Sequence, residues 1–290
     1  MSGKEFRVSV SPHVKSTETI GKLMWTVILA LTPAFLASIY FFGVSALIIT
    51  LSCILSCMIT EFLIVKKFKT NGNPLDGAAI LTGMLLAFCL PPTVPIWIPI
   101  VGGIFAMGVV KHAFGGLGCN IFNPALMARA FLMASWPVIM TTWARPFDAV
   151  TSATPLAIAK MQGMGALKQS MGNGISLYWN LFTGNVSGCI GETSVLLLIL
   201  GGLFLIWRKV ITIETPLTYI LTVGTISVLT GQDIVLHFFA GGLMLGAFFM
   251  ATDYVTTPMT AKGKAVFGIG CGILTMIIRM YGGMPEGVSY

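Results

Sequence analysis

Residues 23–42 read LMWTVILALTPAFLASIYFF, a run without a single charged side chain. A helix rises about 1.5 Å per residue, so a helix of this length is roughly as long as the hydrocarbon core of a bilayer is thick. This stretch therefore predicts a transmembrane helix. It indicates that the chain is an α-helical membrane protein, and the rest of the sequence can be tested against that class of fold.

The whole chain has the composition of a protein with several such helices. Of its 290 residues, 56% are hydrophobic and 9% are charged, whereas a soluble domain carries about 25% charged residues. We therefore expect an all-α, polytopic membrane protein that forms one membrane domain, with nine recognisable transmembrane spans and half-helices within the third, fourth and fifth. The expected spans are residues 23–42, 46–65, 77–90, 96–110, 121–140, 194–207, 216–229, 234–251 and 265–281.

The basic residues predict the orientation in the membrane. If the N-terminus lies inside and the spans alternate, twelve Lys and Arg residues lie in inside segments and three lie outside. An excess of basic residues in cytoplasmic segments is the general rule. We therefore expect residues 1–22 in the cytoplasm and residues 137–193 outside it. The net charge of +7 reports this orientation and does not indicate a nucleic-acid partner.

Two stretches suggest an internal repeat. Residues 115–131 read GGLGCNIFNPALMARAF and residues 246–267 read GAFFMATDYVTTPMTAKGKAVF. Each combines an apolar helix, a break of small and polar residues, a proline, a cation and a phenylalanine. Two halves of five spans each would be inverted in the membrane, and inverted halves with broken helices create a polar site near the midplane. Chance proline and glycine patterning is the alternative.

The polar stretch DAVTSAT, residues 148–154, lies in the expected outside segment. A threonine that becomes a covalent attachment point needs an exposed backbone and small neighbours, and Ser152 and Ala153 leave room beside Thr154. Asp148 could hold the Mg²⁺ of an incoming nucleotide phosphate, because hard cations prefer carboxylate and phosphate oxygens. The alternative is an ordinary helix start, with Thr154 as the cap and Pro155 at the first helical position.

The spacing D-x-x-[S/T]-x-A-T resembles the target motif of flavin transferases, which join FMN to threonine through a phosphodiester. The matching residues are Asp148, Thr151, Ala153 and the acceptor Thr154, with Ser152 where a glycine is usual. Nearly the whole chain also resembles the family formed by the D subunits of the Rnf complexes and the B subunits of the sodium-translocating NADH:quinone reductases. The latter carry a longer N-terminal extension, which favours the Rnf branch. The stretches that carry the resemblance are SPHVKSTETIGKLMW, NGNPLDGAAILTGMLLAFCLPP, GLGCNIFNPALMARAF, CIGETSVL and MATDYVTTPMTAKGK.

The resemblance implies a membrane electron carrier in the prokaryotic cell (inner) membrane. In this family, electrons pass from reduced ferredoxin to NAD through flavins and iron–sulfur centres, and the drop in potential drives Na⁺ or H⁺ translocation. It implies covalent FMN on Thr154, a second, non-covalent riboflavin, and the other Rnf subunits and a flavin transferase as partners. The chain would not be catalytic alone, and no catalytic residue is assigned. Family members usually continue past Tyr290 with one more apolar helix, so a tenth span is expected.

Three polar residues lie in or beside the fifth expected span, namely Asn120, Asn123 and Arg129. An intramembrane arginine is costly and usually faces a polar cavity or a partner. Flavin or ion contact is therefore the functional interpretation of all three. A structural hydrogen bond between helices is the alternative.

Acidic residues near span ends or breaks are candidates for an ion pathway, because such residues can bind Na⁺ or relay protons. The candidates are Asp76, Glu192 and Asp253, and Asp253 is preferred because three threonine hydroxyls lie close to it in sequence. A helix cap or a helix interface is the alternative for each. No metal site is expected. Cys53 and Cys57 share a helix face, but free cysteines are most often buried apolar residues.

A passive solute channel or transporter without a redox cofactor is the competing class of function. Inverted halves, broken helices and polar residues at the midplane would suit it equally well. Thr154 separates the two classes, because a channel has no need of a flavin attachment motif.

Overall fold

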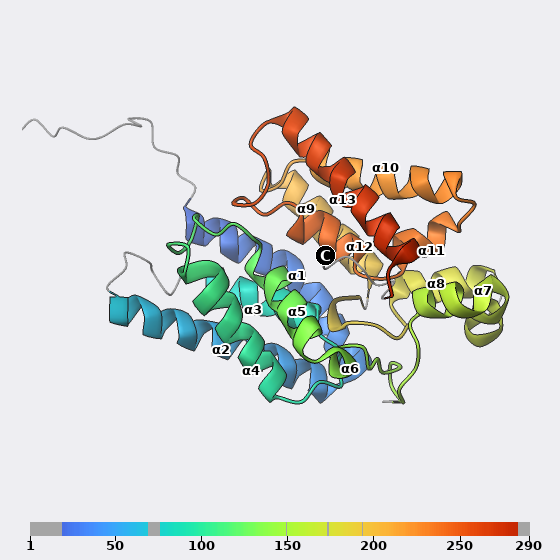
Figure 1. Cartoon of the computed structure of the whole chain (residues 1–290), viewed down its shortest axis with the longest axis horizontal. Coiled ribbons are helices and arrows are strands. Elements are labelled where there is room, and N and C mark those ends of the chain that lie inside the picture. The colour runs from blue at the N-terminus through green and yellow to red at the C-terminus, as the bar shows by residue number, and fades with distance from the viewer. Residues whose placement is uncertain (1–18, 69–75, 149, 173, 193, 284–290) are drawn as a thin grey trace, which may run out of the picture.

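The structure is a computed structural model that describes residues 19–68, 76–148, 150–172, 174–192 and 194–283. These residues form helices, with one isolated β-bridge between Ala144 and Thr151 (Figure 1). The α-helices are α1 (Ile20–Phe42), α2 (Val44–Phe68), α3 (Ala78–Phe88), α4 (Trp97–Phe105), α5 (Pro124–Ser135), α6 (Pro137–Met140), α7 (Pro155–Met171), α8 (Ile175–Thr183), α9 (Val195–Trp207), α10 (Glu214–Leu229), α11 (Ile234–Phe239), α12 (Leu243–Leu245) and α13 (Ala261–Tyr281). Two π-helical turns, η1 (Ala106–His112) and η3 (Gly246–Met250), continue α4 and α12, and a 3₁₀ turn, η2 (Ile190–Glu192), precedes α9.

The apolar character of these helices confirms the all-α, polytopic membrane fold. Three helices, α1, α2 and α13, are long and apolar enough to cross a bilayer alone. Shorter apolar helices occupy the third, fourth, fifth and sixth expected spans. The eighth expected span is broken as well, although half-helices are predicted only within the third, fourth and fifth: α11 ends at Phe239 and α12 begins at Leu243. Gly241, with φ of +72°, makes the break, since this region of backbone space favours glycine.

Several helix ends and the loops between them lie together at one end of the molecule, which we call the Lys111 end. Contacts between residues far apart in sequence identify this end. The backbone of Asp76 lies beside Gly21, so α3 begins next to the start of α1. The other contacts at this end are Lys111 with Glu61, the Lys264 ammonium with the Thr212 hydroxyl at 3.0 Å, and the Tyr254 hydroxyl with the carbonyl of Val210.

The other loops between helices lie at the opposite end of the molecule, which we call the Thr154 end. Figure 1 shows α7 and α8 at this end, on the right. The contacts are Phe147 N with Phe41 O at 3.1 Å, the Thr93 hydroxyl with Thr142 O at 2.6 Å, the Lys160 ammonium with Arg279 O at 3.0 Å, and the Tyr178 hydroxyl with the Asp233 carboxylate.

The two ends give each helix a direction, and the directions support an inverted repeat. Helices α1 and α9 run in opposite directions, as do α2 and α10. Helix α3 follows Gly77 and runs away from the Lys111 end, whereas α12 with η3 follows Gly241 and runs towards it; both glycines have positive φ. Helix α2 packs on α3 and α4, as α10 packs on η3 and α13. The matching parts are therefore α1 and α9, α2 and α10, α3 and α12–η3, and α4–η1 and α13.

The two stretches that first suggested the repeat are not its matching parts. Residues 115–131 and 246–267 both lie at the Lys111 end, and they lead into α5 and α13, which run in the same direction. Inversion requires opposite directions. Their similarity has a local cause, because both are polar breaks after which a new helix begins behind a capping residue, Asn123 or Thr260. The tenth span expected after Tyr290 lies outside the described residues and stays a prediction.

Glycines bring the helices of this fold close together. A Cβ atom on Gly83 would lie 2.7 Å from the Cα atom of Ile54, so α3 crosses α2 in backbone contact. A Cβ atom on Gly201 would lie 2.5 Å from the carbonyl oxygen of Ala30, so α9 crosses α1 equally closely. Small residues at such crossings are typical of helix packing in membranes.

Candidate functional site

The residues before Thr154 form a short hairpin at the Thr154 end. The amide of Arg145 donates to the carbonyl of Val150 at 2.9 Å, and the amide of Ser152 donates to the carbonyl of Trp143 at 3.0 Å. Asp148, Thr151 and Ala153 are exposed. The residues that flank the attachment point therefore face outwards, where a modifying enzyme could reach them.

Thr154 itself is the N-cap of α7, with Pro155 at the first helical position. Its hydroxyl oxygen accepts a hydrogen bond from the amide of Ala157 at 3.2 Å. The residue is 1% exposed, so the expectation of an exposed attachment point holds for Ala153 and is wrong for Thr154, while Ser152 is half-buried and Pro155 is buried. One reason is that a capping side chain turns inwards over its own helix. In addition, a 2.5 Å hydrogen bond between the hydroxyls of Ser152 and Ser187 fixes the segment before Thr154 against residue 187.

The position of Thr154 suits a phosphate ester. A helix N-terminus carries partial positive charge and stabilises anions. A phosphate on the Thr154 hydroxyl would lie at the first turn of α7, next to the small residue Ala153. Because Thr154 is buried, a group could be joined to its hydroxyl only after the surrounding side chains move.

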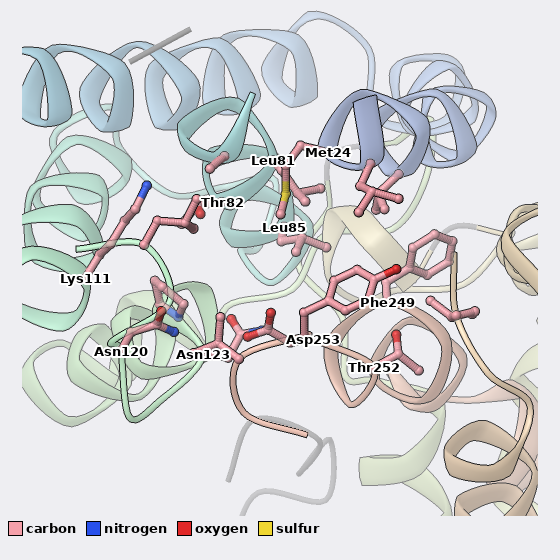
Figure 2. A pocket seen from close by; sticks show the side chains of 18 of the residues that line it. Met24, Leu81, Thr82, Leu85, Lys111, Asn120, Asn123, Phe249, Thr252 and Asp253 are labelled. Atoms are coloured by element: carbon pink, nitrogen blue, oxygen red, sulfur yellow. The ribbon is translucent and has the colours of Figure 1, made fainter. Parts of the chain in front are cut away.

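A second candidate site is a cavity of about 100 Å³ at the Lys111 end, between the two halves of the repeat, which we call the inter-half cavity. Figure 2 shows Asn120, Asn123 and Asp253 together in its wall, with Met24 and Leu81 on another side. The two polar breaks at 113–123 and 251–260 thus meet in space. Three of the polar residues singled out from the sequence therefore lie together.

The polar groups of the inter-half cavity are partly used within their own loops. The Asn123 side-chain oxygen caps α5 by accepting from Ala125 N at 3.0 Å. The Asn120 amide donates to Phe122 O at 2.9 Å. Of the threonines near Asp253 in sequence, Thr256 donates to its carboxylate at 3.3 Å. The other two, Thr252 and Thr257, donate instead to the carbonyls of Phe248 and Ala251.

A buried ion pair lies beside the inter-half cavity. The sequence did not predict that its two residues pair. The Lys111 ammonium lies 2.5 Å from a Glu61 carboxylate oxygen, and the two side chains are 2% and 4% exposed. Lys111 also lines the inter-half cavity. The sequence holds one signal, an acid inside the second apolar run, but its partner lies fifty positions away and only the packing of η1 on α2 reveals it.

Arg129 is not among the residues that line the inter-half cavity, although it lies close to Asn120 and Asn123 in sequence. It is 5% exposed. Its guanidinium donates to the carbonyl of Cys89, at the C-terminal end of α3, at 2.7 Å, and lies 3.1 Å from the sulfur of Cys189. The cause is helical geometry: Arg129 lies more than one turn after Asn123, which places it deeper in the fold.

The other two acids proposed for an ion pathway lie apart from Asp253. Glu192 is buried near Arg129, where the two side chains attract each other electrostatically. The Asp76 carboxylate accepts from Ala78 N at 2.8 Å at the start of α3, as a helix cap does. Among the described residues, no group of three or more His, Cys, Asp or Glu side chains is placed to hold a metal ion.

Comparison with known proteins covers almost the whole chain. The family described as the NQR2, RnfD, RnfE family matches residues 7–290. Over 297 residues, the chain is 48% identical to the D subunit of the proton-translocating ferredoxin:NAD(+) oxidoreductase complex of Clostridium ljungdahlii, with 98% of this chain and 89% of the relative covered.

Two further relatives extend the comparison. The D subunit of the Na(+)-translocating ferredoxin:NAD(+) oxidoreductase complex of Acetobacterium woodii is 48% identical over 294 residues, which cover 100% of this chain and 90% of the relative. The D subunit of the ion-translocating oxidoreductase complex of Rhodobacter capsulatus is 38% identical over 301 residues, which cover 93% and 84%. On the fold and on these similarities, the chain belongs to the NQR2, RnfD, RnfE family.

Proposed function

We propose that the chain is the D-type membrane subunit of an ion-translocating ferredoxin:NAD oxidoreductase complex, and that it carries electrons through FMN bound covalently to Thr154. The observation that carries the proposal is the 48% identity, over 98% and 100% of this chain, to two D subunits of such complexes. The covalent FMN is supported by the flavin-transferase motif, whose acceptor threonine lies at a helix N-terminus that suits a phosphate.

In this proposal the flavin supplies the electron chemistry and the chain supplies position and charge. The exposed side chains of Asp148 and Thr151 present the motif to a flavin transferase, and the first turn of α7 stabilises the phosphate. The other subunits of the complex supply donors and acceptors, so the isolated chain has no turnover of its own.

Fluorescence of the denatured chain under ultraviolet light tests the cofactor directly. Covalent flavin survives denaturation, so the band of this chain in a denaturing gel should fluoresce. A passive channel would give a dark band. A chain produced without the flavin transferase is the matched control, and it should also be dark.

We propose that the inter-half cavity lies on the ion pathway. It offers oxygen atoms from Asn120, Asn123 and Asp253, and such atoms suit Na⁺ or protonated water. At about 100 Å³ it has room for a few water molecules and is smaller than the roughly 300–1,000 Å³ of pockets that bind whole small molecules. The inter-half cavity therefore fits an ion and is too small for the non-covalent riboflavin that the family resemblance implies. A separate cavity of about 560 Å³, which Asn123 also lines, falls within the size range of small-molecule pockets.

Replacing Asp253 by Asn should lower ferredoxin-dependent ion uptake by the assembled complex about tenfold or more, because the cavity loses its negative charge. Covalent FMN on Thr154 should be unchanged, since Thr154 lies at the other end of the molecule. Asp253→Glu keeps the charge and should retain more uptake than Asp253→Asn. Equal uptake by the wild type and Asp253→Asn would remove Asp253 from the pathway.

We also propose that the Thr154 end faces away from the cytoplasm. The described basic residues support this, because the Lys111 end carries Lys22, Lys66, Lys67, Lys111, Arg208, Lys209, Lys262 and Lys264, whereas the Thr154 end carries Arg145, Lys160, Lys168 and Arg279. Cytoplasmic segments are the basic ones.

Cysteine labelling in intact cells tests this orientation. Lys168 and Lys262 are both exposed and lie at opposite ends. Lys168→Cys should react with a membrane-impermeant thiol reagent in intact cells, and Lys262→Cys should react only after the membrane is opened. The reverse pattern would invert the orientation.

A further inference from the structure

Helix α7, which follows Thr154, is divided by a kink at Gly163, where φ is +82° and ψ is 168°. Beyond the kink, the buried Leu167 packs with Leu177 and Leu181 of α8. Residues 155–162 form only two helical turns before the kink. So short a helix is not stable alone, and its position must come from contacts of its own.

Two side chains on one face of these turns supply the contacts. Leu156 and Lys160 are four residues apart and therefore lie on the same side of the helix. Leu156 is 4% exposed, and a Cβ atom on Gly241 would lie 3.0 Å from one of its methyl groups. The start of α7 thus rests on the break between α11 and α12.

Lys160 attaches the same face to the end of α13. Its ammonium donates to the carbonyl of Arg279 at 3.0 Å and to the carbonyl of Gly282 at 2.5 Å. These are carbonyls of the last turn of α13 and of its C-cap, where the helix dipole attracts a cation.

The end of α13, which Lys160 contacts, is joined to the end of α11 by a buried arginine, Arg279. Arg279 is 3% exposed, and its guanidinium forms the contacts. It donates to His237 O at 2.6 Å and to Ala240 O at 3.0 Å, at the end of α11. The end of α13 and the break at Gly241 therefore form one connected support; in Figure 1 the end of α13 lies beside α11.

We infer that Lys160 is a positioning residue, which fixes the first two turns of α7, and with them the Thr154 attachment point, on the end of α13. This inference rests on the proposed covalent flavin at Thr154. In this inference, Lys160 keeps the flavin at a constant position relative to the membrane helices. Electron transfer requires such a position, because the distance to the next carrier must stay fixed.

Lys160→Met tests the inference in the assembled complex, because it keeps the length of the side chain and removes its charge. Amide hydrogen exchange in residues 157–162 should become roughly tenfold faster, the equivalent of losing a charge-assisted hydrogen bond. The rotational anisotropy of the FMN fluorescence should fall, while the amount of covalent FMN stays at the wild-type value. Ferredoxin-dependent ion uptake should fall roughly tenfold or more.

Two variants serve as controls. Lys160→Arg can donate to the same carbonyls and should restore exchange, anisotropy and uptake. Lys168→Met removes an exposed charge from the same helix beyond the kink and should leave all three unchanged. Wild-type exchange and anisotropy in Lys160→Met, or an equal effect of Lys168→Met, would overturn the inference. A wild-type chain without covalent flavin would instead overturn the proposed function, and the hydrogen exchange result would still report whether Lys160 anchors α7.

Discussion

A Thr154→Val chain should carry no covalent flavin, and its band in a denaturing gel should be dark. Valine has the shape of threonine but lacks the oxygen to which the phosphate would be joined. Mass spectrometry of the peptide that contains residue 154 should show the mass of FMN in the wild type and the bare peptide in the variant. Ferredoxin-dependent ion uptake by the complex should fall to the background value, because the proposed electron path would be interrupted.

The structure requires a control for this experiment. Thr154 also caps α7, and losing a cap costs about 0.5–2 kcal/mol of stability. Thr154→Asn keeps a capping oxygen but has no hydroxyl, so it separates a loss of the acceptor atom from a loss of helix stability, and it should be as dark as Thr154→Val. Covalent flavin in the valine variant would show that another residue is the acceptor.

Asp148→Ala should slow attachment without unfolding the chain, because Asp148 is exposed.

Arg129→Leu should destabilise the protein by about 3–5 kcal/mol, the usual effect of removing one partner of a buried charge pair. The variant would leave the Cys89 carbonyl, at the end of α3, without its 2.7 Å hydrogen bond and would remove the positive charge of Arg129 that attracts the buried Glu192. The expected result is a lower melting temperature and a lower yield of assembled complex. Thermal unfolding in detergent measures the first, and size-exclusion chromatography measures the second.

The double variant Arg129→Leu, Glu192→Gln separates a structural role from a direct role in transport. If Arg129 stabilises the fold by balancing Glu192, removing both charges should recover part of the lost stability. If Arg129 instead offsets charge during transport, Arg129→Leu should assemble with the melting temperature of the wild type and lose ion uptake. That second outcome would contradict the role that the structure gives to Arg129.

The sequence by itself determined the class of the protein and the local signals along the chain. Uncharged runs such as residues 23–42 predicted helices where the structure has them. Thr154 followed by Pro155 predicted a helix start, and α7 begins there. These features depend on side chains that are neighbours along the chain, because hydropathy, capping and proline geometry act over one or two helical turns.

Only the tertiary structure decided which polar residues meet. It joined Asn123 to Asp253 across the two halves, paired Lys111 with Glu61, and separated Arg129 from all of them. It also buried Thr154 and placed the break at Gly241 under the start of α7. The physical reason is that contacts between residues far apart in sequence depend on helix direction and on how closely two helices approach. Close approaches such as those at Gly83 and Gly201 bring together backbones that no local pattern connects.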